Sequence, residues 1–266
     1  MKIIDIDEIF ENSLKEYIKN NSDMREEELE DKIVSLYAEF ENKKLDELNG
    51  ETHVTYFEKM SSEEKVLSLK EYVLKKVSVP DFLCEAIERD ENSKSYLLAL
   101  LDEKDEELIS YAINMLKNYV DESVLTKCFE LLLCVKTKAE IKDILAELLG
   151  ENADAIKSKI ILEYEKRNDL QGYFVDILSN CQKDDGVYSI LIDNFLRSDD
   201  LLLSCAYLKK YGDERALKFL YTEIEREDLN YAEFKELKFT IEALGGQYDK
   251  VRDFTNDKYY KKLHDI

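Results

Sequence analysis

The chain carries nearly the same ten residues twice: Leu116-Lys-Asn-Tyr-Val-Asp-Glu-Ser-Val-Leu125 and, ninety-two positions later, Leu208-Lys-Lys-Tyr-Gly-Asp-Glu-Arg-Ala-Leu217. Six of the ten positions are identical. Ninety-two is about three times 31, and a period near thirty residues is typical of stacked helical repeats. The sequence therefore predicts an all-α fold, a right-handed α-α superhelix in which each helix pair packs on its neighbours.

Helix-start signals recur at the same period. The first helices of the expected pairs begin near residues 105, 137, 168, 198 and 229, in steps of 32, 31, 30 and 31. Capping boxes are expected at four places, where a short polar residue is followed three positions later by Glu. Their first residues are Asp23, Ser61, Thr137 and Asn230. Further N-caps are expected at Asp121, Asp184, Ser198 and Asp213.

Apolar columns in the second helices support one repeated unit. Aligned on their starts, these helices carry apolar residues at three shared positions, seven, eight and eleven residues on, which form one helix face. The first column is Cys128, Ile160, Leu191 and Leu220, and the last is Leu132, Tyr164, Phe195 and Ile224. Residues 79–266 are therefore predicted to form a solenoid of about five or six helix pairs. Residues 1–78 are predicted to form an N-terminal helical cap, with helices near 3–20 and 23–48 and a looser stretch from Asn49 to Met60.

The link between paired helices resembles that of the HEAT-like repeats of the phycocyanobilin-lyase type. Tyr211-Gly-Asp-Glu-Arg-Ala-Leu217 is the nearest match, and Tyr119-Val-Asp-Glu-Ser-Val-Leu125 is similar but lacks the Gly. The resemblance implies that the second helices line a concave side that holds a protein. It supplies no catalytic residues, because members of this family share a shape rather than a reaction.

Charge restricts the partners that the chain can have. The formal net charge of the 266 residues is −22, and residues 1–60 alone carry −9. Such a chain repels phosphate backbones and anionic membranes and attracts basic proteins. Solubility alone is the competing explanation of the charge. We expect a protein partner with a basic surface, no nucleic acid and no membrane, and the oligomeric state stays open.

Residues for catalysis or metal binding are scarce. The two histidines, His53 and His264, have no partners at metal-ligand or triad spacing. No two of the five cysteines have the spacing of a metal or redox motif, and all lie in apolar helical stretches, so we expect buried thiols in a reducing compartment.

No signal peptide and no bilayer-spanning run is expected, which favours a cytoplasmic protein. We expect no bound metal and no cofactor.

A polar stripe on the second helices is the predicted site. Its members are Thr126, Glu130, Ser189, Asp193 and Lys218. Such a stripe is either a solvated face or the contact surface of a partner on the concave side. The predicted function is a non-catalytic protein-binding or scaffold protein. The alternatives are an acidic immunity or inhibitor protein that masks a basic partner and, from a different class, a lyase-type enzyme with a concave pocket. A nucleic-acid repair enzyme is disfavoured because the stripe is not basic.

Overall fold

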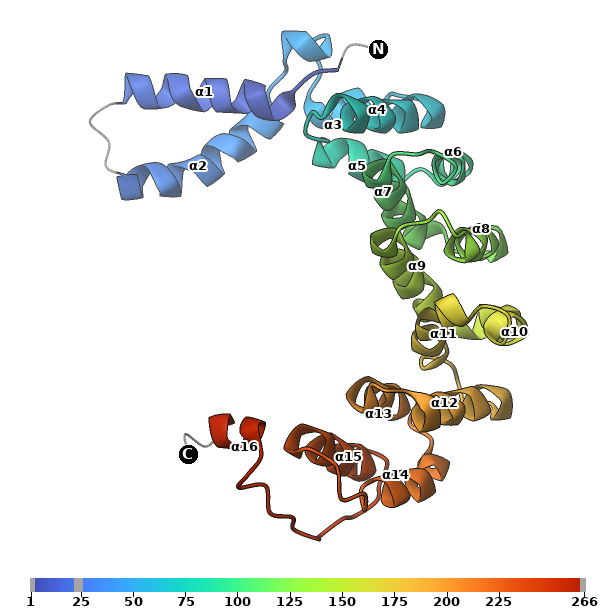
Figure 1. The fold of residues 1–266 in the computed structure, drawn as a ribbon. Helices are drawn as coiled ribbons and strands as arrows, with labels where there is room; N and C mark the ends of the chain where they lie inside the picture. Colours follow the sequence, from blue (N-terminus) through green and yellow to red (C-terminus); the bar gives the residue numbers. More distant parts are fainter. Residues whose placement is uncertain (1–2, 22–25, 264–266) are drawn as a thin grey trace. The chain divides into compact units, whose positions relative to one another are not determined.

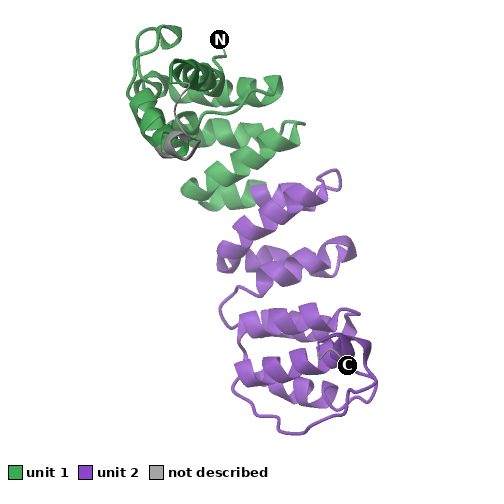
Figure 2. Ribbon diagram, turned by 90° about the vertical axis from the view of Figure 1, so that its left-hand side faces the viewer, with its two compact units in different colours: residues 1–127 green, residues 128–266 purple. Residues whose placement is uncertain are grey.

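A computed structural model describes residues 3–21 and 26–263, and within these ranges the chain is helical, without β-strands. The predicted all-α class is confirmed. The chain divides into two compact units, residues 1–127 and 128–266 (Figure 2). The predicted boundary of the helical cap, after residue 78, falls inside the first unit and stays a prediction.

Unit 1 (residues 1–127) contains a helix pair followed by shorter helices (Figure 1). The helices are α1 (Ile6–Asn20), α2 (Glu26–Glu41), α3 (His53–Glu58), α4 (Ser62–Lys75), α5 (Asp81–Glu88), α6 (Lys94–Leu100) and α7 (Glu106–Leu116). Short 3-10 turns lie at Asp46–Leu48, Glu91–Ser93 and Lys117–Tyr119. The helix α8 (Glu122–Leu133) spans the boundary between the two units.

Unit 2 (residues 128–266) has two layers (Figure 1). One layer is α9 (Ala139–Glu151), α11 (Gln171–Leu178), α13 (Leu201–Tyr211) and α15 (Tyr231–Ala243). The other is α10 (Ala153–Tyr164), α12 (Asp185–Arg197) and α14 (Leu217–Glu223), and α16 (Lys258–Leu263) follows an extended segment. Within the first layer α9 packs extensively on α11, and α13 on α15.

Most of the predicted helix starts are correct. Ser61 and Asn230 form complete capping boxes, and Asp121, Asp184 and Asp213 accept backbone N–H groups at their helix starts. Two predictions are wrong. The Thr137 hydroxyl donates to the Leu131 carbonyl instead of capping α9, and Asp200 rather than Ser198 caps α13. Asp23 lies outside the described residues.

The apolar columns form the core of unit 2. Cys128, Ile160, Leu191 and Leu220 are all buried, and so are Leu132, Tyr164, Phe195 and Ile224. In the middle column Phe129 and Ile192 are buried, Ile161 is half-buried and Tyr221 is exposed. Burial of a shared face in successive helices is what a repeated unit requires, because one helix pair cannot cover its own apolar stripe.

The helix pairs have a different phase from the predicted one. The sequence pairs α9 with α10, but the structure packs α10 more extensively on α11, and likewise α12 on α13 and α14 on α15. Sequence periodicity sets the length of the repeating unit and leaves open which helix begins it. The Tyr211–Leu217 segment therefore connects α13 to the pair that follows, rather than two helices of one pair.

The tyrosine of each copy of the duplicated segment bonds to backbone about thirty residues earlier in the chain. The Tyr119 hydroxyl donates to the Ile87 carbonyl at 2.6 Å. The Tyr211 hydroxyl accepts from the Asp184 backbone N–H at 2.7 Å and donates to the Asp184 carbonyl at 2.9 Å. These partners lie 32 and 27 residues earlier in the chain. The identical Tyr in both copies thus performs the same structural task.

Lysines near the start of three helices pair with acidic residues that lie 25 to 27 positions later in the chain. Lys65 meets Asp90 at 2.8 Å, and Lys157 meets Asp184 at 3.3 Å. Lys94 pairs in the same way with Asp121, and this contact holds the pKa of the Asp121 carboxyl below its ordinary value. The acidic caps are therefore partly neutralised within the fold.

Three predicted segments differ from the structure. The second helix ends at Glu41, not near residue 48, and the expected loose stretch contains α3, which a Thr52 capping box starts. The sequence also predicts a helix near 248–262, which is correct only for its last part, α16, because residues 247–257 are not helical. There the Arg252 guanidinium donates to the carbonyls of Ile224 and Arg226, so side-chain contacts hold this segment extended against the end of α14.

No helix in the described ranges combines the length and the apolar composition that crossing a membrane requires.

Candidate functional site

The predicted stripe residues lie on three helices. Thr126 and Glu130 are on α8, Ser189 and Asp193 on α12, and Lys218 on α14. Glu130, Ser189 and Lys218 are exposed, whereas Thr126 and Asp193 are half-buried. Asp193 pairs with Arg197 at 2.9 Å, and the Lys218 ammonium lies 4.7 Å from the Phe219 ring centroid. These contacts of Asp193 and Lys218 stay within their own helices, so the stripe remains a predicted contact surface rather than a converging site.

A groove lies on the other layer of unit 2, between α9, α11 and α13. Its volume is about 230 Å³. Eight described residues line it: Asp143, Ala146, Glu147, Gly150 and Glu151 from α9, Asp176 and Asn180 at the end of α11, and Lys210 from α13. Four of the eight are carboxylates and one is a cation. The groove is therefore acidic.

Small residues on α9 allow the close packing behind this groove. Ala146 and Gly150 are both buried. A Cβ added at Gly150 would lie 3.1 Å from the Asn180 side-chain nitrogen. That nitrogen donates to the carbonyls of Asp176 and Ile177, satisfying backbone groups at the end of α11. Gly150 therefore leaves room for the side chain that closes one end of the groove.

The acidic side chains come from the helix period. Asp143, Glu147 and Glu151 are spaced four residues apart on α9, so they lie on one helix face. Asp176 faces them from α11 and pairs with Lys210 at 3.3 Å. Burial, and then a hydrogen bond to Asp143, raise the pKa of the neighbouring Tyr173 hydroxyl. Tyr173 is therefore neutral at pH 7 and adds no charge of its own.

The groove suits a cationic group. Carboxylates accept charge-assisted hydrogen bonds from Lys and Arg, and these bonds are shorter and stronger than neutral ones. A basic side chain entering between Asp143 and Asp176 would compete with Lys210 for the Asp176 carboxylate. The lining residues supply no imidazole, thiol or hydroxyl nucleophile.

The His53 ring is not placed for acid–base work. His53 is fully buried between the rings of Phe40 and Phe82, at centroid distances of 4.6 and 5.8 Å. Within the described residues neither ring nitrogen of His53 has a hydrogen-bond partner, and burial lowers its pKa. His264 lies outside the described residues.

One cysteine differs from the expected buried set. Cys128, Cys181 and Cys205 are buried and Cys84 is half-buried, but Cys134 is exposed. Cys134 follows the last residue of α8, where the backbone turns outward. A hydrogen bond from the Lys136 backbone N–H lowers the pKa of its thiol, and the neighbouring Thr137 side chain acts in the same direction. The prediction of a buried thiol is wrong at this position.

The chain matches no protein-family model, no curated protein and no solved structure. The function of these sites is therefore inferred from their geometry alone. Sequence reasoning missed the acidic groove, although the four-residue spacing of carboxylates on α9 is visible in the sequence.

Proposed function

We propose that this chain is a non-catalytic, cytoplasmic protein-binding or scaffold protein, built as a HEAT-like solenoid, whose acidic surface engages a basic protein. The observation that carries the proposal is the groove of α9, α11 and α13, where four carboxylates and one lysine line about 230 Å³. The net charge of −22 acts in the same direction, because it accelerates encounter with basic partners.

The predicted polar stripe is the second candidate contact surface of the same protein. The groove has an advantage over it in geometry, since Asp143 and Asp176 converge on one hollow from two helices. The stripe offers Glu130 and Asp193 on α8 and α12, which are separated by α9, α10 and α11 in the sequence. An immunity or inhibitor protein that masks a basic face is one form of this proposal, because masking needs no chemistry beyond binding.

The test is capture of partners from native lysate, followed by mass spectrometry, with two matched variants. The groove variant carries Asp143→Lys and Glu147→Lys, and the control carries Glu130→Lys and Asp193→Lys. Asp143, Glu147 and Glu130 are exposed and Asp193 is half-buried, and both variants change the net charge by the same amount. We expect a basic protein to be recovered with wild type and control and lost with the groove variant. Equal recovery with all three proteins contradicts the assignment to the groove.

A further inference from the structure

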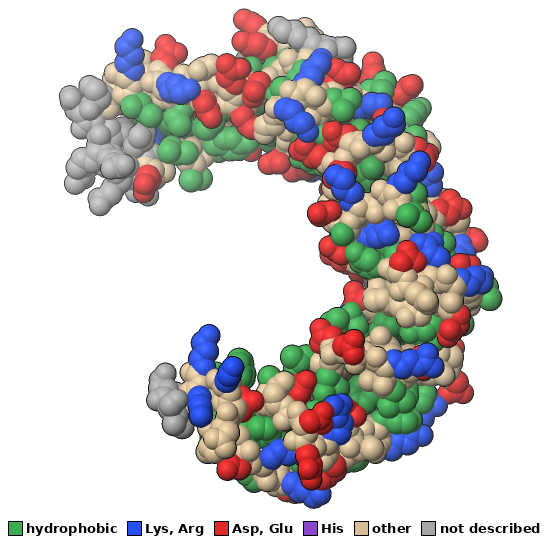
Figure 3. Space-filling view, viewed as in Figure 1, with side chains coloured by type: hydrophobic (Ala, Val, Ile, Leu, Met, Phe, Trp, Pro, Cys, Tyr) green, Lys and Arg blue, Asp and Glu red, His purple; other side chains and the backbone are tan. Residues whose placement is uncertain are grey.

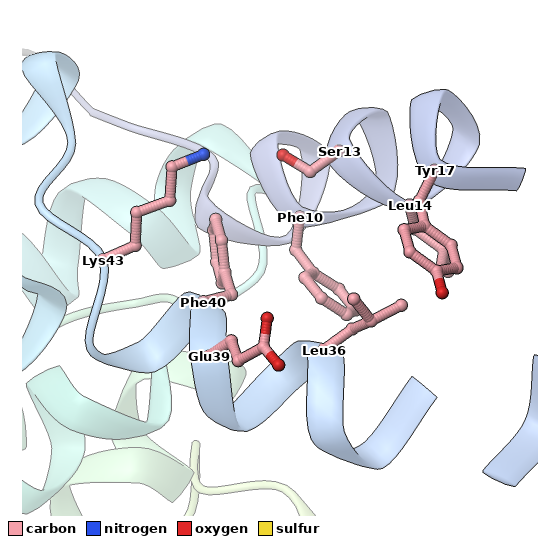
Figure 4. Close-up of a pocket in the computed structure, with 8 residues that line it drawn as sticks. All are labelled: Phe10, Ser13, Leu14, Tyr17, Leu36, Glu39, Phe40 and Lys43. Atoms are coloured by element: carbon pink, nitrogen blue, oxygen red, sulfur yellow. The ribbon is translucent and has the colours of Figure 1, made fainter. Parts of the chain in front are cut away.

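The α1–α2 pair of unit 1 carries an apolar groove. Phe10, Leu14 and Tyr17 project from α1 toward α2, and Leu36 and Phe40 project from α2 toward α1 (Figure 4). The groove has a volume of about 400 Å³. Except for Phe40, which is buried, these five side chains are half-buried. The two helices therefore meet along an apolar seam that one side leaves accessible.

One end of the groove is anchored to the rest of unit 1. Phe10 contacts Phe40 at a ring-centroid distance of 5.1 Å, and Phe40 packs on the buried His53 at 4.6 Å. His53 in turn contacts Phe82 of α5. The Tyr72 hydroxyl donates to the Ile4 carbonyl, just before α1, at 2.7 Å. The base of the groove is thus preorganised, which lowers the entropy that a ligand must remove on binding.

The apolar surface continues away from that base. Ile18 of α1 is 40% exposed, and Tyr37 and Val34 of α2 are 37% and 76% exposed. An amphipathic helix normally buries its apolar stripe against another element. In unit 2 the first and last apolar columns are buried in that way, whereas Phe10, Leu14, Tyr17 and Leu36 of this pair are only half-buried. Within the described residues the pair therefore leaves part of its apolar seam accessible.

The size of the groove sets the size of the occupant. The lining residues of α1 run from Phe10 to Tyr17, which corresponds to about 11 Å at 1.5 Å per residue. A single helix of at least two turns would lie along them. Leucines or aromatics at positions i, i+3, i+4 and i+7 would enter the groove as anchors.

Charge decides which helix fits. Among the described side chains, Asp7, Glu8, Glu11 and Glu16 of α1 are exposed, as are Glu30 and Glu39 of α2, and they outnumber the exposed lysines of the two helices, Lys15, Lys19 and Lys32. Glu39 lines the groove itself, opposite the single lysine there, Lys43. Apolar side chains lie along α1 and α2 with both acidic and basic side chains beside them (Figure 3). A second copy of this chain would bring the same acidic excess to the contact and be repelled.

We propose that the α1–α2 groove binds an amphipathic α-helix of a partner protein whose polar face is basic. The apolar anchors supply the affinity, and the acidic rim selects the partner and raises its association rate. This site lies in unit 1 and does not depend on the acidic groove of unit 2.

The test uses the full chain and a fluorescent 14-residue synthetic helix of leucine and lysine, with leucines at the anchor spacing. Anisotropy should show saturable binding that weakens as salt rises. Leu14→Asp should weaken binding by at least about tenfold, although it makes the protein more acidic, because it places a charge in the apolar seam. The matched control is Leu162→Asp in α10, a leucine that is 68% exposed, and it should bind like wild type.

Further variants distinguish three causes of weaker binding: loss of the apolar anchors, loss of charge attraction and loss of folding. Glu39→Lys keeps every apolar lining residue and should weaken binding while flattening its salt dependence. Circular dichroism reports whether Leu14→Asp keeps its helices. If Leu14→Asp does not keep its helices, the affinity of Glu39→Lys for the probe tests the proposal instead. Equal affinity of wild type, Leu14→Asp and Glu39→Lys overturns the proposal, and so does equal binding of a leucine–glutamate probe. Self-association of the wild type that Leu14→Asp abolishes would make a second copy the occupant and also overturn it.

Discussion

The grooves of the two units both lie between amphipathic helices, yet their linings are opposite. In unit 2 the first and last apolar columns are buried, and the groove of α9, α11 and α13 is lined by four carboxylates and one lysine. In unit 1 the groove of the α1–α2 pair is lined mainly by apolar side chains, among them Phe10, Leu14 and Leu36. The difference lies in the residues placed four positions apart: carboxylates at this spacing face the groove on α9, whereas Phe10 and Leu14 face it on α1.

Truncation of core leucines should give the largest effect that sharpens this comparison. Leu191→Ala or Leu220→Ala in unit 2 should lower the free energy of unfolding by about 2–5 kcal/mol, because these side chains are 1% and 0% exposed. Leu14→Ala in the open seam should cost about 1 kcal/mol or less. Leu162→Ala, at an exposed position, should be near neutral. Urea unfolding measures all four variants, and an equal cost at Leu14 and Leu220 would break the comparison.

The duplicated tyrosines should give the next largest effect. Tyr211→Phe removes two hydrogen bonds to the Asp184 backbone and leaves a part-buried N–H without its partner, at a cost of about 1–3 kcal/mol. Tyr119→Phe removes one bond, to the Ile87 carbonyl, and should cost about 0.5–1.5 kcal/mol. Thermal unfolding of the two variants shows which substitution lowers the stability more. A larger loss for Tyr119→Phe would show that the two copies do not perform equivalent tasks.

A smaller effect is expected from pH acting on His53. Burial lowers the folded-state pKa of His53 below its ordinary value of 6.5. Below about pH 6.5 the unfolded chain therefore takes up a proton that the folded chain does not. The free energy of unfolding decreases as the pH falls through this range. The His53 side chain alone changes the free energy of unfolding by at most about 1.4 kcal/mol per pH unit.

The control for this effect is His53→Leu, which cannot titrate. Its free energy of unfolding, followed by urea denaturation between pH 7 and pH 5, should fall less steeply than that of wild type. Parallel slopes for the two proteins would show that His53 does not contribute to the pH dependence of unit 1.

Thiol labelling should report the smallest structural difference, with no change in stability. Iodoacetamide should modify Cys134 first, because its thiol is exposed and has a lowered pKa. Burial raises the pKa of Cys84, Cys128 and Cys205 to about 12, so these should react last. Peptide mass spectrometry over a time course gives the order. Labelling of Cys128 as fast as Cys134 would contradict the described end of α8.

Local signals in the sequence were enough for most of the fold. Capping residues such as Ser61 and Asn230 marked helix starts correctly, because capping depends on a few neighbouring atoms. The burial of Leu191 and Leu220 followed from periodicity. The extended segment 247–257 could not be predicted in this way, since contacts from Arg252 to the end of α14 hold it. Those contacts join residues far apart in the sequence.

The sites were predictable only in part. The spacing of Asp143, Glu147 and Glu151 predicts the acidic face of α9. The groove beside this face also needs Asp176 and Lys210 from two further helices. The apolar seam could not be distinguished from a core by pattern. Phe10 and Leu14 have the spacing of any buried helix face, and only the structure shows that they are half-buried.

The affinity of the partner recovered from lysate, measured with the full chain at two salt concentrations, tests the central claim most directly. The proteins compared are wild type, the groove variant Asp143→Lys with Glu147→Lys, and the stripe variant Glu130→Lys with Asp193→Lys. We predict that the groove variant binds at least about tenfold more weakly and loses most of its salt dependence, while the stripe variant binds like wild type. Unchanged binding by the groove variant, with loss in the stripe variant, would contradict the account and assign the partner to the polar stripe.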